Sequence, residues 1–192
     1  RSAAAGTVMP RSLRCAVLLA LLGAAPLGVD ALEINRLDVS RSEGVYQVQL
    51  DALIDALLPR VRAVLLDASA MLQLDPSLKS ATATEEADGL RVQSEVEECL
   101  FGLCRRLLHV QKVQASGNSI HAQTLAVQGS GFRSGSAHWQ LEAEGSRTRL
   151  IFTADTEPNL WVPPLIGPPT VIRHMREKAG QSLQNLEQLA RE

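Results

Sequence analysis

Four histidines are the side chains best suited to proton transfer in this 192-residue chain: His109, His121, His138 and His174. Imidazole titrates near neutral pH, so a histidine inside a cavity can act as a general acid or base. His121 and His138 fall in expected strands and could face a cavity as a pair. Strand alternation, however, puts His138 opposite Trp139 and toward solvent, which leaves His121 as the candidate for a catalytic role. The ordinary alternative for all four is a structural or solvent-facing position.

Three acidic residues, Glu95, Glu97 and Glu98, form a second group with chemical potential. Glu95 and Glu97 share a strand face, where neighbouring carboxylates can raise the pKa of one of them. A solvated outer face explains the same pattern. The sequence contains no nucleophile elbow, zinc-protease motif or glycine-rich phosphate loop. We therefore expect no defined catalytic set, no metal site and no cofactor.

Cys99 and Cys104 are separated by four residues with Gly102 among them, a spacing that suits a hairpin turn. In an oxidising compartment such cysteines pair, and closing so short a loop contributes about 2 kcal/mol. A C-x-x-C redox motif has a different spacing, and a zinc site would lack nearby histidines apart from His109. The sequence favours a structural disulfide.

Residues 1–31 have the order of a cleavable secretory signal, with Met9 as its expected initiator. Arg11 and Arg14 precede the apolar run of residues 15–22 (CAVLLALL), and an A-x-A-like site ends at Ala31. The alternative is an uncleaved anchor, for which the run is short and interrupted by Gly and Pro. We expect secretion across an inner membrane, periplasmic localisation and one domain over residues 32–192.

The charge of that domain argues against nucleic acid as a partner. Residues 1–31 hold three Arg and one Asp, so 19 − 3 = 16 basic and 21 − 1 = 20 acidic residues remain, a net charge of −4. The basic residues are scattered, whereas a surface that follows phosphates needs a basic patch. We expect a monomer without a nucleic-acid partner.

The elements that position these side chains follow from the hydrophobic pattern. Residues 45–52 alternate as a half-buried strand, and residues 53–74 change to the spacing of two short helices, with Leu57 and Leu72 on the shared apolar face. Residues 78–155 predict a meander of strands without intervening helices, which implies one antiparallel sheet. Residues 170–190 predict a single long amphipathic helix.

This order of elements resembles the START-like (SRPBCC, helix-grip) superfamily, and within it the polyketide cyclase/dehydratase and coenzyme Q-binding-protein-like branch in exported bacterial form. The likeness covers residues 43–191 and is carried by the following motifs: residues 64–67 (VLLD), 72–80 (LQLDPSLKS), 138–141 (HWQL), 148–152 (TRLIF) and 162–164 (VPP), with the Cys99/Cys104 strand pair. The resemblance implies an α+β fold in which a curved antiparallel sheet wraps a long C-terminal helix, with two short helices after the first strand. It implies a ligand cavity and no invariant catalytic set.

The resemblance places the cavity between sheet and helix, where an apolar ligand would be held by buried area. The residues expected to line it are Trp139, Leu141, Leu150, Phe152, Trp161, Ile172, Met175 and Ala179. If helix and sheet pack flush, the same residues are simply core. The proline-rich segment of residues 160–169, from Leu160 to Pro169, is expected to close the cavity as a lid or to make transient membrane contact; an ordinary helix entry is the alternative.

We therefore expect an exported carrier of a hydrophobic small molecule, such as a lipid, a quinone or a polyketide-like compound. A cyclase or dehydratase that uses His121 is the second hypothesis, and requires that histidine inside a pocket. An envelope scaffold that binds proteins through residues 160–169 and has a filled core is the third.

Overall fold

The computed structural model describes residues 32–100, 102–159, 163 and 166–192, and these form eight strands and three helices. In chain order the elements are β1 (Glu33–Ser42), β2 (Val45–Ile54), α1 (Leu58–Leu66), α2 (Ala68–Leu74), β3 (Leu78–Glu86), β4 (Gly89–Leu100), β5 (Leu103–Ser116), β6 (Ser119–Thr124), β7 (Phe132–Glu144), β8 (Arg147–Pro158) and α3 (Gly167–Arg191). The expected signal segment, residues 1–31, lies outside the described residues.

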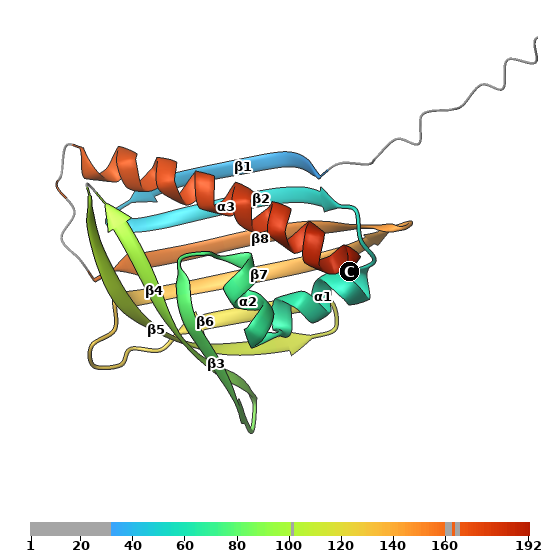
Figure 1. The fold of residues 1–192 in the computed structure, drawn as a ribbon, viewed down its shortest axis with the longest axis horizontal. Helices are drawn as coiled ribbons and strands as arrows, with labels where there is room; N and C mark the ends of the chain where they lie inside the picture. Colours follow the sequence, from blue (N-terminus) through green and yellow to red (C-terminus); the bar gives the residue numbers. More distant parts are fainter. Residues whose placement is uncertain (1–31, 101, 160–162, 164–165) are drawn as a thin grey trace, which may run out of the picture.

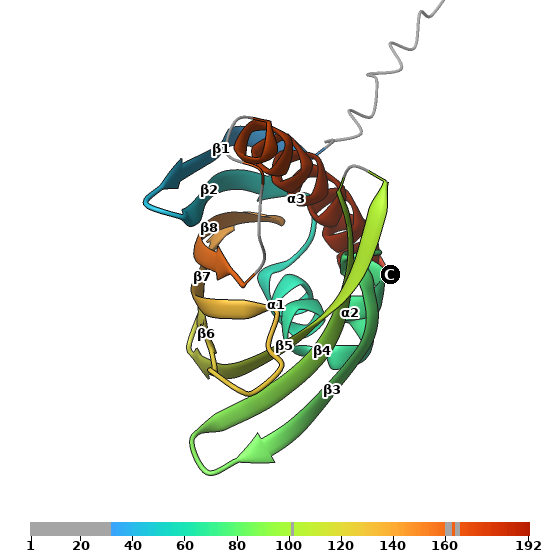
Figure 2. The same cartoon turned by 90° about the vertical axis from the view of Figure 1, so that its left-hand side faces the viewer.

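The strands form one antiparallel sheet in the order β1-β2-β8-β7-β6-β5-β4-β3. The sheet curves strongly, and α3 runs along its open side, with β1 on one flank and the β3–β4 edge on the other (Figures 1 and 2). The α+β helix-grip fold is confirmed. One element was missed: β1 precedes the expected first strand, so the two short helices follow the second strand rather than the first.

Short-range polar contacts set the break between α1 and α2 and the turn after α2. The Asp67 carboxylate accepts hydrogen bonds from the Ser69 backbone N–H at 2.8 Å and hydroxyl at 2.7 Å, which caps the first turn of α2. Asp75 accepts the same pair of bonds from Ser77 at 2.9 Å and 2.7 Å. The first of these Asx turns sets the start of α2, and the second leads from the end of α2 into β3.

One half of the space between sheet and helix is packed as a core. Ile54, Val61 and Leu141 are 0% exposed and contact a cluster that includes Leu183 and Leu186 of α3. The expected burial of Leu57 and Leu72 was wrong: they are 55% and 38% exposed. Because α1 and α2 are separate helices of nine and seven residues, a single apolar stripe does not run through both.

Polar contacts fix the C-terminal half of α3 over this core. The Asn185 amide donates to the backbone carbonyls of Gln73 and Leu74 at 2.9 Å and 3.2 Å. Arg191 pairs with the Asp55 carboxylate at 2.6 Å, so the end of α3 is tied to the end of β2. These contacts leave the N-terminal half of α3 facing the uncovered part of the sheet.

Candidate functional site

A cavity of about 500 Å³ lies between the concave face of the sheet and α3. Its walls come from all three helices and from seven of the eight strands, and 24 of its 33 lining residues have apolar side chains. Charged side chains occur on one wall only, where α3 approaches β4. Space of this size and lining is typical of sites that hold small hydrophobic molecules.

Three alanines in register leave this space open. Ala122 of β6 pairs with Ala137 of β7, and Ala137 pairs with Ala154 of β8. All three point to the concave face and line the cavity. We call this row the alanine floor. One row along the strands, Phe152 and Trp139 are paired and their rings lie 5.0 Å apart, so large side chains fill the space there. The cavity is thus a consequence of residue size at three aligned positions.

The structure places the eight suggested lining residues as follows. Trp139, Leu150, Phe152, Met175 and Ala179 line the cavity. Leu141 does not, because it stands one row nearer the packed end and is 0% exposed in the core. Ile172 is also absent from the lining. It lies about 100° around α3 from the lining residue Val171, since each helical residue turns by that angle. Trp161 lies outside the described residues.

Four uncharged polar residues of the lining form a belt beyond the alanine floor: Ser94, His109, Gln111 and Thr156. Thr124 lies directly behind this belt, where its hydroxyl contacts His109. Thr124 pairs in register with Gln111. Gly135 stands next to Thr124 on β7, and a Cβ there would come within 2.7 Å of the Thr124 hydroxyl and 3.4 Å of the Thr156 hydroxyl. Glycine at this position therefore leaves room for the Thr124 hydroxyl group.

Sequence reasoning missed both histidines that line the cavity, His174 of α3 and His109 of β5. His109 belongs to the polar belt. Its Nε2 lies 3.0 Å from the Thr124 hydroxyl, and its ring contacts the Phe132 ring with centroids 4.3 Å apart. Burial lowers the pKa of His109 to about 4, because a charged imidazole is poorly solvated there. His109 is therefore neutral at physiological pH. Leu107, His109 and Val113 are an even number of residues apart on β5 and so share one strand face. This pattern could have indicated that His109 points inward.

A charged cluster closes the gap between α3 and the β4 edge. The Lys178 ammonium donates to the Ser77 hydroxyl and the Glu98 carboxylate, both at 2.6 Å, and pairs with Asp75 at 3.2 Å. The second Glu98 oxygen lies 3.0 Å from His174 Nε2. Two carboxylates thus face one ammonium group. The Lys178 ammonium is already engaged by three oxygen partners, so it is not available to pair with the carboxylate of a ligand. By its alternation with Val92 and Val96, Glu98 belongs to the inner face of β4.

The remaining residues considered for acid-base chemistry lie on the outer face of the sheet. His121 is exposed, so the expectation of a cavity role for it was wrong. It pairs with His138, and the two rings stack with centroids 4.1 Å apart. Burial, and then the nearby His121 charge, lower the pKa of His138. Glu97 pairs with Lys79 at 3.2 Å and Glu95 is exposed, as expected for a solvated face.

Cys99 and Cys104 face each other across the β4–β5 hairpin and form a disulfide, as expected. Within residues 32–192 as far as they are described, no three metal-binding side chains gather into a site. None of the helices in the described ranges has the length and apolar character needed to cross a membrane. Residues 160–162, 164 and 165, half of the segment 160–169, lie outside the described residues, so its expected lid or membrane role stays a prediction; the last three residues of the segment begin α3.

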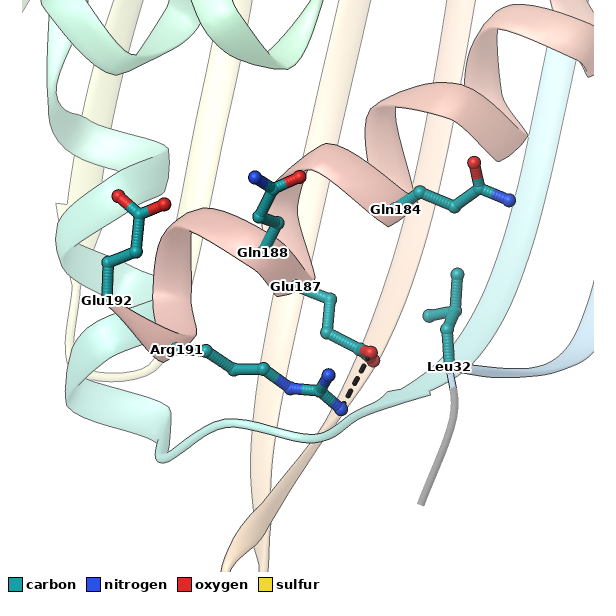
Figure 3. A pocket seen from close by; sticks show the side chains of 6 residues that line it. All are labelled: Leu32, Gln184, Glu187, Gln188, Arg191 and Glu192. Atoms are coloured by element: carbon teal, nitrogen blue, oxygen red, sulfur yellow. Dashed lines mark ion pairs between the residues drawn. The ribbon is translucent and has the colours of Figure 1, made fainter. Parts of the chain in front are cut away.

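A second hollow, of about 480 Å³, lies at the C-terminal end of α3 (Figure 3). It is open to solvent and lined by polar residues and Leu32. Its Glu187 carboxylate accepts the Asp55 backbone N–H at 3.2 Å and pairs with Arg191 at 2.9 Å. These contacts hold the end of α3 against the end of β2, so we assign the residues around this hollow a structural role rather than a ligand-binding one.

Comparison with known proteins finds the fold in several solved structures. The Zhui aromatase/cyclase from Streptomyces sp. R1128 superposes with a TM-score of 0.61 at 16% identity, over 77% of this chain and 94% of that chain. A START superfamily protein from Mycobacterium smegmatis gives 0.59 at 19% identity, over 74% and 98%. Human STARD10 gives 0.55 at 9% identity, over 80% and 72%.

No protein-family model matches the chain. No curated protein matches it either. At these identities the solved structures show the fold alone: the chain has the START-like, SRPBCC helix-grip fold.

Proposed function

We propose that this chain is an exported binding or carrier protein for a hydrophobic small molecule, such as a lipid, a quinone or a polyketide-like compound, held between the sheet and α3. The observation that carries the proposal is the cavity of about 500 Å³ above the alanine floor. Packed interiors rarely contain voids larger than a water molecule, so an opening of this size is not ordinary core. The scaffold alternative requires a filled core and does not agree with it.

Two measurements test the proposal. Mass spectrometry of protein purified under native conditions should reveal a bound hydrophobic compound, and the neutral dye Nile red should bind the delipidated protein at one saturable site. Ala154→Phe, which places a ring above the floor, should weaken dye binding at least tenfold, about 1.4 kcal/mol. Ala143→Phe is the matched control, because Ala143 lies on the neighbouring strand β7 and is exposed. Absence of both a bound compound and saturable dye binding would overturn the proposal.

A second candidate function is acid-base chemistry on a bound ligand, favoured by the His174–Glu98 contact of 3.0 Å on the cavity wall. A histidine oriented by a carboxylate can move a proton in a cyclisation or dehydration. Incubation of the native ligand with the protein would then yield either a cyclised isomer of unchanged mass or a product that has lost water. His174→Gln should abolish that product while leaving ligand retention intact; recovery of unchanged ligand counts against this candidate.

Export is supported by the secretory pattern of residues 1–31 and by the disulfide, which persists in oxidising compartments. Expression of the full chain in a bacterium should give a shortened protein with residues 1–31 removed in the periplasmic fraction. A variant lacking residues 9–31 should stay in the cytoplasm with Cys99 and Cys104 open to thiol labelling. We also propose a monomer that contacts membranes transiently through residues 160–169, for which Trp161→Ala should slow ligand transfer to lipid vesicles.

A further inference from the structure

The polar groups of the cavity are arranged in order along its length. Trp139, Phe152 and Ile120 form an apolar row at one end, and the alanine floor follows. His109 stands four residues along β5 from Val113, the partner of Ala122, which is roughly 13 Å in a strand. Glu98 stands a further four residues along β4 from Ser94, the partner of His109. A ligand that fills the apolar end therefore reaches the polar belt before it reaches the charged cluster.

His109 and Thr124 form a neutral pair that can hydrogen-bond to a ligand oxygen whether that oxygen donates or accepts. Nε2 of His109 is engaged with the Thr124 hydroxyl at 3.0 Å, and no described residue bonds to Nδ1. If Nε2 donates to Thr124, Nδ1 is an acceptor; if Nε2 accepts, Nδ1 carries the proton and donates. The pair can thus accept from a hydroxyl group or donate to a carbonyl group. A charged ligand gains no ion pair there.

The same wall offers no cation for an acidic ligand. Among the described lining residues there is no arginine, and the single lysine, Lys178, is held by two carboxylates and a hydroxyl group. A carboxylate or phosphate buried beside His109 would lose its hydration without a cation to compensate its charge, which is strongly unfavourable. The charged cluster therefore acts against anions as well.

We propose that the His109–Thr124 pair is the hydrogen-bonding anchor of the cavity and selects hydrophobic ligands that carry an uncharged oxygen, a carbonyl or hydroxyl group, over ligands with an anionic head. This inference rests on the proposed function, because it concerns which molecule the cavity holds. It assigns the specificity to two residues that also keep each other in position. The apolar end and the floor then determine how large the rest of the ligand is.

Competition against Nile red tests the inference at pH 7.5 with three probes of equal chain length: 2-dodecanone, 1-dodecanol and dodecanoate, each below its micellar concentration. The ketone and the alcohol should displace the dye at least tenfold more strongly than the carboxylate. His109→Phe keeps a ring against Phe132 and removes the hydrogen bond, so it should weaken the ketone and the alcohol about five- to tenfold while dodecanoate changes least, each affinity being corrected for the Nile red affinity of the same variant. His121→Phe, at the exposed histidine, is the matched control and should behave as wild type.

The outcomes separate this inference from the proposed function. If Nile red does not bind wild type and no hydrophobic compound co-purifies with it, the proposed function fails and the anchor with it. If Nile red binds but dodecanoate competes as well as 2-dodecanone, or His109→Phe leaves all three affinities unchanged, only the anchor is overturned. Should thermal melting show that His109→Phe is unfolded, Thr124→Val takes its place, because it removes the hydroxyl and conserves the shape. It should weaken the ketone about threefold or more, and wild-type affinities would overturn the anchor.

Discussion

Replacing Ala137 by leucine should stabilise the ligand-free protein, because the added side chain enters open space. Leucine adds three carbons, each worth about 0.8 kcal/mol when buried, or about 3 × 0.8 = 2.4 kcal/mol in total. Ordering the leucine side chain costs about 0.5–1 kcal/mol. The expected gain in the free energy of unfolding is therefore about 1.5 kcal/mol. In a packed interior the same change would force atoms together and lower the stability by about 1–3 kcal/mol.

Two other alanines on the inner positions of the sheet calibrate the measurement. Ala143, on the same strand as Ala137, is exposed, and Ala143→Leu should leave the stability nearly unchanged. Ala52 is 0% exposed in the core, and Ala52→Leu should lower the free energy of unfolding by about 1–3 kcal/mol. The assay is equilibrium urea unfolding of delipidated protein followed by circular dichroism, since a bound ligand would stabilise the wild type through mass action.

The reasoning is refuted if Ala137→Leu loses stability as Ala52→Leu does. That result would mean that the space above the floor is filled by neighbouring side chains in solution. The opposite signs expected for these two buried-face alanines make the experiment decisive, because β-propensity and hydrophobicity change equally in both.

Three further perturbations follow from the charged and covalent contacts. His109 takes up a proton near pH 6.5 in the unfolded chain but only near pH 4 in the folded chain, so the free energy of unfolding should fall as the pH drops between these values. The total loss is about (6.5 − 4) × 1.36, or 3 kcal/mol. Urea unfolding at four pH values should show this slope in wild type and not in His109→Phe. Lys178→Met leaves two carboxylates facing each other at a partly buried site and should lower the free energy of unfolding by about 1–2 kcal/mol. Lys79→Met, on the outer face, is the control and should stay close to wild type. Equal losses in the two variants would contradict a special role for the charged cluster. Double replacement of Cys99 and Cys104 by serine should lower stability by about 2 kcal/mol and abolish the effect of dithiothreitol on the unfolding curve.

The sequence predicted the architecture because its strongest patterns are long. The alternation in β7 and β8 and the apolar stripe of α3 each extend over ten or more residues, so single polar positions do not obscure them. β1 was missed because one face of it is polar and most of its residues are exposed. Its pairing with β2 and its contact with α3 depend on tertiary context that local pattern does not contain.

The site was predictable only in part, because a cavity depends on register between strands. Trp139 and Phe152 could be placed on the concave face from alternation, but the alignment of Ala122 with Ala137 and Ala154 requires the pairing itself. The choice of His121 over His109 failed for a related reason. Both residues lie in strands, where odd- and even-numbered side chains point to opposite faces. Which of the two faces is concave on β5 and β6 depends on the curvature of the whole sheet.

The three alanines of the floor belong to three different strands, and this has a consequence for how such a protein diverges. Each residue can grow or shrink without a change in backbone pairing, and none of them makes a side-chain hydrogen bond that substitution would break. Substitutions at these positions can therefore alter the length or width of the accepted molecule one residue at a time, without a change in strand pairing. Ligand preference on this scaffold is free to drift faster than the scaffold itself, so relatives with the same fold need not share a ligand.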